Sequence, residues 1–166
     1  MGRWRPPAPK SAPYITATGF ETLQKEQQRL WVRRKDVVKA LSAAAAEGDR
    51  SENAEYIYRK KELAGIDRRI RYLQKRLPEL TVVSRPGALD QVFFGAFVAL
   101  VKPDGQTVEY RIVGADETDS KLGYISLDSP MAKALMKKHE GDLVNVRLGD
   151  REEEFEVLSI RYTTDP

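Results

Sequence analysis

A heptad repeat in the second quarter of the chain constrains the fold more than any other feature. Apolar side chains recur every seven residues there, and a second apolar set fills the alternate positions, with charged residues between them. The two sets are Tyr56, Leu63, Ile70, Leu77 and Ile66, Leu73, Leu80. Only Arg59 interrupts this seam. Such a repeat predicts one helix of a coiled coil.

A second apolar stripe, broader and less strict, precedes the repeat. Its members are Phe20, Leu23, Leu30, Trp31, Val37, Val38, Leu41 and Ala45. Gly48 breaks the helical pattern and leaves room for a tight reversal. We therefore predict an antiparallel coiled coil over residues 14–81, with each arm of roughly 27 residues about 40 Å long. Thr16 or Thr18 can cap the first helix, and Glu21 can complete a capping box with Thr18.

The predicted reversal, Gly48–Asn53, carries two carboxylates, Asp49 and Glu52. Carboxylate oxygens suit Mg²⁺, which proteins usually hold with one or two carboxylates together with substrate phosphates. Two acids can therefore complete a metal site whose other ligands come from a partner, and a second metal there would assist phosphodiester hydrolysis. The same two residues also fit a capping box, with Asp49 as N-cap and Glu52 three residues later. The residues alone leave both alternatives open.

The net charge of +3 conceals an uneven distribution. Residues 14–81 hold 15 Lys and Arg against 10 Asp and Glu, a net +5, whereas residues 82–166 hold 10 against 15, a net −5. A basic coiled coil joined to an acidic globule indicates two different partners, with nucleic acid as the partner of the basic part. The clustered cations of the second helix fit a phosphate contact, but they also fit an ordinary solvated face.

Residues 1–13 are rich in proline, lack periodicity and carry three basic residues and no acid. They predict a disordered basic arm, which is either a solubilising leader or a nucleic-acid contact through Arg3, Trp4 and Arg5. The absence of cysteine excludes disulfides, thiol catalysis and zinc–thiolate sites, and a single histidine, His139, argues against histidine-rich metal sites. No apolar run is long enough to span a bilayer and no signal-peptide pattern opens the chain, so we expect a cytoplasmic protein.

The C-terminal half changes to a period of two. Pro78 should kink or end the second helix, and Arg85-Pro86-Gly87 marks a linker over residues 82–88. The pattern predicts strands over residues 92–101, 107–115, 124–127, 143–148 and 155–162, with a short helix over 131–138. Ser129 can cap that helix and Pro130 suits its first position. The order βββαββ predicts a small α+β domain over residues 89–166.

Four separate segments carry a family resemblance. GDRSENAEY at residues 48–56 resembles the Gre transcript-cleavage factors of bacterial RNA polymerase. IDRRIRYL at 66–73, VFFGA at 92–96 and ISLDSPMA at 125–132 look like the GreB branch in particular. The similarity covers about residues 14–162, in order and without large gaps.

The resemblance implies an N-terminal antiparallel coiled coil followed by a C-terminal FKBP-like α+β domain. The C-terminal domain would dock at the rim of the polymerase secondary channel, and the coiled coil would pass down it. By match, Asp49 and Glu52 would help to hold a second Mg²⁺ in the polymerase active site, where backtracked RNA is cut. The chain would then be a monomeric factor with no cofactor of its own, and not itself an enzyme.

Two further sets of residues take roles from the resemblance. Asp128, Ser129 and Pro130 fall where the family's C-terminal domain contacts polymerase, although they equally fit a helix cap. Arg59, Lys60 and Lys61 would contact the 3′ end of the extruded RNA. The alternative is a regulator that binds polymerase through the same channel without promoting cleavage. Prolyl isomerase activity does not follow from an FKBP-like fold alone, and no constellation in the sequence supports it.

Overall fold

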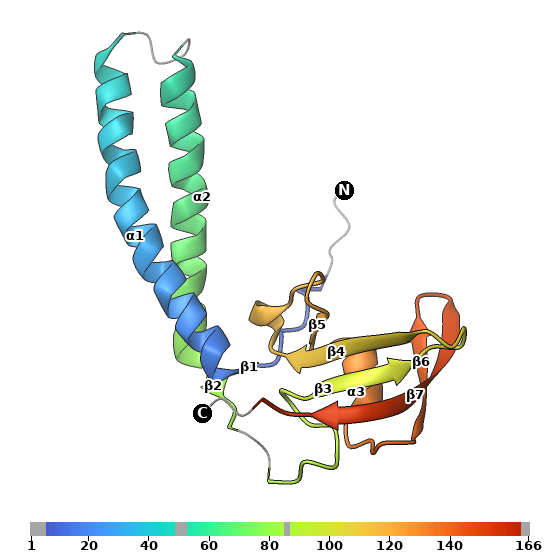
Figure 1. Cartoon of the computed structure of the whole chain (residues 1–166). Helices are drawn as coiled ribbons and strands as arrows, with labels where there is room; N and C mark the ends of the chain where they lie inside the picture. Colours follow the sequence, from blue (N-terminus) through green and yellow to red (C-terminus); the bar gives the residue numbers. More distant parts are fainter. Residues whose placement is uncertain (1–5, 49–52, 85–86, 164–166) are drawn as a thin grey trace. The chain divides into compact units, whose positions relative to one another are not determined.

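The computed structural model describes residues 6–48, 53–84 and 87–163 (Figure 1). Contacts divide the chain into two compact units, and each is considered by itself. Thr18–Leu80 forms one unit, and the described residues before and after that range form the other. In the described ranges, no helix combines the length and the apolar character that crossing a membrane requires.

The first unit consists of two long antiparallel helices, as predicted (Figure 1). Helix α1 spans Ala17–Ala46, and helix α2 spans Ala54–Arg76. At 1.5 Å per residue, the 30 residues of α1 extend about 45 Å. Helix α2 gives way to a single 3₁₀ turn, η1, at Leu77–Glu79. Pro78 therefore ends the second helix, because it has no N–H to continue the helical hydrogen bonds.

The apolar seam of the two helices is confirmed in the middle of the pair. Val37 of α1 packs with Ile66 and Ile70 of α2, and Leu30 and Leu63 cover this cluster. The first stripe was predicted too broadly, since one of its members, Trp31, leaves 43% of its surface exposed. The narrower seam is what two helices alone can bury.

Three ion pairs join the two helices along their flanks. They are Arg33 with Glu62 at 2.6 Å, Arg34 with Asp67 at 2.7 Å, and Arg69 with Glu26 at 2.6 Å. Each pairs an arginine of one helix with a carboxylate of the other, so together they favour one antiparallel register of the helices. Each is also partly exposed, so its contribution to stability is small, about 0–1 kcal/mol.

Helix α1 begins two residues earlier than a Thr18–Glu21 capping box would require, at Ala17 instead of Gly19. Thr18 lies inside the first turn, and Glu21 forms an ion pair with Lys25 at 2.6 Å. That predicted capping box is therefore wrong. Thr16 directly precedes the helix, and its hydroxyl donates a hydrogen bond to the carboxylate of Glu117.

The second unit is built on a five-stranded sheet in the order β5-β4-β3-β7-β6 (Figure 1). The strands are β3 (Phe97–Val101), β4 (Thr107–Val113), β5 (Tyr124–Ser126), β6 (Leu143–Leu148) and β7 (Arg151–Arg161). A 3₁₀ turn, η2 (Ala115–Glu117), follows β4, and helix α3 (Pro130–Leu135) lies between β5 and β6. Within this sheet, β4 and β5 pair in parallel, and the other three pairs of neighbouring strands are antiparallel. The predicted order βββαββ and the α+β class are confirmed.

The predicted first strand, residues 92–101, is shorter in the structure. Strand β3 begins at Phe97, because Gly95 adopts a φ of 87°, a conformation that interrupts an extended strand. Val92 bonds elsewhere: its N–H donates to Lys138 O at 2.9 Å, and its carbonyl accepts from Lys137 N at 2.8 Å. The run is buried or half-buried along its length, but only its second half is strand.

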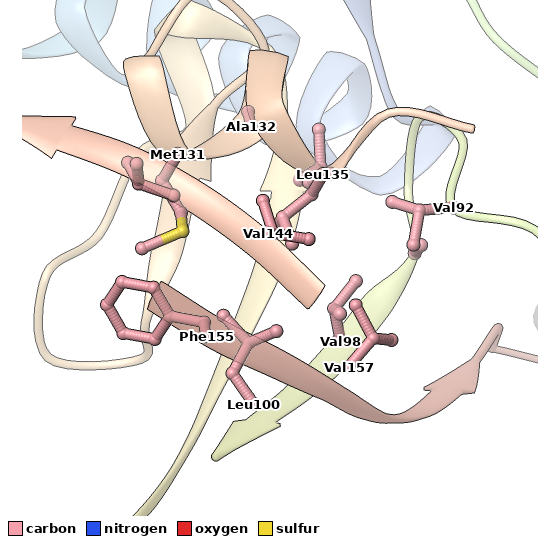
Figure 2. Close-up of a cluster of buried hydrophobic side chains, with 12 residues drawn as sticks. Val92, Val98, Leu100, Met131, Ala132, Leu135, Val144, Phe155 and Val157 are labelled. Carbon is pink, nitrogen blue, oxygen red and sulfur yellow. The ribbon is translucent and has the colours of Figure 1, made fainter. Parts of the chain in front are cut away.

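Helix α3 covers one face of the sheet and closes the core of this unit (Figure 2). Its inward side chains are Met131, Ala132 and Leu135, and they meet side chains of the sheet such as Val98 and Phe155. Leu135, Val98 and Ala132 are fully buried. This packing fixes the start of α3, and therefore the residues directly before it, on a rigid base.

A two-residue parallel pair ties the N-terminal segment to the same unit. Strand β1 (Tyr14–Ile15) pairs with β2 (Thr81–Val82). Gly114 packs so closely that a Cβ there would lie 2.1 Å from the carbonyl oxygen of Tyr14. Residues 14–17 thus group with the sheet, whereas the predicted boundary placed them with the coiled coil. Strands this short have no periodicity for a sequence pattern to reveal.

Candidate functional site

The connection between α1 and α2 contains the acids that the sequence singles out. Asp49 and Glu52 lie outside the described residues. The residues on either side are Gly48, with a φ of 129°, and Asn53, the N-cap of α2. No group of three or more His, Cys, Asp and Glu side chains that could hold a metal ion occurs among the described residues. The predicted metal role of the two acids therefore stays a prediction.

Asn53 caps α2. Its backbone is extended, with φ −84° and ψ 101°, and its Oδ1 accepts a hydrogen bond from Tyr56 N at 3.1 Å. The carbonyl of Asn53 accepts the first helical bond from Ile57 N at 3.1 Å. The capping alternative placed the N-cap at Asp49, and it is wrong, because the cap lies four residues later. Asparagine is among the best N-cap residues, so Asn53 directly before a helical run was the available signal.

The same side chain reaches the other helix. Asn53 Nδ2 donates to the carbonyl oxygen of Ala44 at 2.9 Å. That carbonyl is among the last four of α1, which have no partner within their own helix. It also accepts from Glu47 N at 3.2 Å. Ala44 is 4% exposed, and its small side chain lets the two helices approach closely at this end.

The three basic residues predicted to contact RNA differ in their surroundings. Arg59 forms ion pairs with Glu55 at 2.8 Å and with Glu62 at 3.0 Å, and these hydrogen bonds raise the pKa of Arg59. Its charge is therefore balanced locally. Lys60 and Lys61 are exposed, and no described carboxylate lies within 4.0 Å of either ammonium group. The two lysines are the cations of this trio that remain available to a phosphate.

The structure places Asp128, Ser129 and Pro130 at the start of α3. Ser129 is its N-cap and accepts from Ala132 N at 3.2 Å, and Pro130 is its first residue. The cap alternative thus holds for Ser129. Asp128 and Pro130 are exposed, and the Asp128 carboxylate accepts from Ala12 N at 2.9 Å. An exposed carboxylate and an exposed proline therefore flank the cap residue at the start of α3.

Comparison with known proteins assigns both halves of the chain. The family model described as "Transcription elongation factor, N-terminal" matches residues 13–82. The model described as "Transcription elongation factor, GreA/GreB, C-term" matches residues 86–162. The chain therefore belongs to the GreA/GreB family of transcription elongation factors.

Individual relatives point to one branch. The transcription elongation factor GreB of Xanthomonas axonopodis pv. citri is 54% identical over 167 residues, which cover 99% of each chain. The transcription elongation factor GreB of Pseudomonas aeruginosa is 49% identical over 168 residues, which cover 100% of each. Among solved structures, the GreA factor homolog 1 (Gfh1) protein of Thermus thermophilus is 26% identical with a TM-score of 0.42, covering 89% of this chain and 97% of that one. The predicted resemblance to the GreB branch is confirmed.

Proposed function

We propose that this chain binds bacterial RNA polymerase as a monomer, inserts its two-helix unit into the secondary channel and stimulates the polymerase's own cleavage of backtracked RNA. Arrested complexes would regain an RNA 3′ end in the active site and resume elongation. The chain would act as a cofactor of polymerase in the cytoplasm, with the reaction taking place in the polymerase active site.

The observation that carries this proposal is the N-cap of α2. Because Asn53 supplies the cap, the helix needs neither Asp49 nor Glu52 for that purpose. Two carboxylates three residues apart can then serve as ligands for a hard cation. Two carboxylates are too few to hold Mg²⁺ by themselves. They suit a metal site whose remaining ligands polymerase and the RNA phosphates would supply. A second Mg²⁺ held there would activate the attacking water and stabilise the leaving oxygen.

The remaining residues take supporting roles in this proposal. Lys60 and Lys61, which have no carboxylate of the described chain within 4.0 Å, would contact the phosphates of the extruded RNA. Arg59, balanced by its two glutamates, would contribute less. Asp128 and Pro130 would contact the rim of the channel, while Ser129 holds the helix start in place.

The test is fragment release from stalled elongation complexes that contain backtracked RNA. The parent chain should accelerate release of short 3′ fragments, and Asp49→Asn or Glu52→Gln should reduce the rate to that of polymerase alone while leaving binding intact. Glu47→Gln is the matched control, because it removes an exposed carboxylate directly after α1 and leaves Asp49 and Glu52 unchanged. Parental activity in both tip variants would overturn the role of the acids. Tight binding by the parent without any fragment release would favour the regulator instead.

A further inference from the structure

A hydrogen bond between Asn53 and Ala44 joins the two helices. It lies beside the segment that connects α1 to α2 and that contains Asp49 and Glu52. One side chain amide accepts from Tyr56 N in α2 and donates to Ala44 O in α1, at 3.1 and 2.9 Å. Seven residues of the chain, 47–53, connect the helices, because α1 ends at Ala46 and α2 begins at Ala54. One side chain therefore links the two helices directly beside this connection.

We propose that Asn53 is a positioning residue for the tip carboxylates, because it fixes the two ends between which Asp49 and Glu52 are held. This inference rests on the proposed function and adds to it a residue that would touch neither metal nor RNA. A carboxylate pair that must meet a metal held in another protein needs its own backbone fixed beforehand, since misplacement by about 1 Å can cost about a hundredfold in rate.

The chemistry of the side chain explains why the position suits asparagine. A helix N-cap needs only an acceptor, which Asp and Ser provide about as well as Asn. The bond to Ala44 also needs a donor, and an amide carries an acceptor and donors on separate atoms. An ionised aspartate has no donor, and a serine hydroxyl is one bond shorter. Either replacement therefore keeps the cap and removes the connection between the helices.

The surroundings of Asn53 support separate roles for its two side-chain atoms, with Oδ1 capping α2 and Nδ2 bonding to α1. The Ala44 carbonyl receives two donors, Glu47 N and Asn53 Nδ2, so both of its lone pairs are used. Asn53 is itself half-buried, and Ala44 is 4% exposed. Losing the Asn53 donor would remove this hydrogen bond between the two helices.

The test uses the full-length chain with Asn53→Ser and Asn53→Asp. The sequence has one other asparagine, Asn145, exposed on β6, so Asn145→Ser and Asn145→Asp are matched controls for the same chemical changes. Fragment release is measured over a range of factor concentrations, which separates the maximal rate from the concentration that gives half of it. Helix content is followed by circular dichroism.

Both Asn53 variants should lower the maximal rate about tenfold or more. Their half-maximal concentration should stay within about twofold of the parent, since contacts with polymerase elsewhere are unchanged. Helix content should be retained, and the Asn145 variants should match the parent.

Parental maximal rates in both Asn53 variants would overturn the inference and leave the proposed function standing. A change confined to the half-maximal concentration would also overturn it. If the parent released no fragments at all, the proposed function would fail first, and this inference would fail with it.

Discussion

Replacing Ile70 by alanine should lower the free energy of unfolding of the two-helix unit by about 2–3 kcal/mol. Ile70 is 4% exposed in the cluster with Val37 and Ile66, and the change removes three buried carbons at about 0.8 kcal/mol each. The cavity adds to this loss, but a two-helix seam can partly collapse, and alanine recovers about 0.5 kcal/mol through its higher helix propensity.

Circular dichroism at 222 nm during denaturation in urea measures this loss, because α1 and α2 contain 30 and 23 residues against 6 in α3. The control is Ile57→Ala, which makes the same chemical change in the same helix at a side chain that is 52% exposed. Ile57→Ala should lower the free energy of unfolding by less than about 1 kcal/mol. Only about half of the Ile57 surface is buried, and the higher helix propensity of alanine offsets part of the loss. Equal losses at both positions would refute the assignment of the seam.

Three further predictions test other parts of the structure. Ala44→Leu should destabilise the helix pair by about 1–3 kcal/mol in urea unfolding, because Ala44 is 4% exposed, whereas Ala46→Leu at an exposed position should be nearly neutral. Ser129→Ala should cost the sheet unit about 1 kcal/mol by thermal unfolding, since it removes the cap of α3, and no loss would contradict that role. The hydrogen bond from Arg33 lowers the pKa of Glu62 below its usual 4.5. The stability that Glu62 contributes is therefore present above pH 4.5 and is lost as the pH falls below it. In an acid titration of the helix pair, Glu62→Gln should lose less stability than the parent.

The parts of the fold that local chemistry determines could be predicted from the sequence. The heptad over residues 56–80 gave the buried positions Ile66, Ile70 and Leu73, because a period of seven places them on one face of a helix. Ser129-Pro130 gave the start of α3, since a serine cap and a proline in the first turn depend on adjacent residues only.

The parts that depend on distant partners could not be predicted. The β1–β2 pair joins residues more than 60 positions apart through strands of two residues each. The ion pairs of Arg59 are local by contrast, since Glu55 lies four residues before it and Glu62 three after it, and this helical spacing was an available signal. Asn53 is the instructive case. Its cap is a local signal, whereas its bond to Ala44 requires the second helix to be in place.

The proposed role of Asp49 and Glu52 is to supply carboxylates to a Mg²⁺ in the polymerase active site. The most direct test is the Mg²⁺ dependence of RNA cleavage in backtracked complexes saturated with the parent chain or with Asp49→Asn. The parent should lower the Mg²⁺ concentration required for half-maximal cleavage, and Asp49→Asn should require as much as polymerase alone. An identical Mg²⁺ dependence for Asp49→Asn and the parent would contradict the claim.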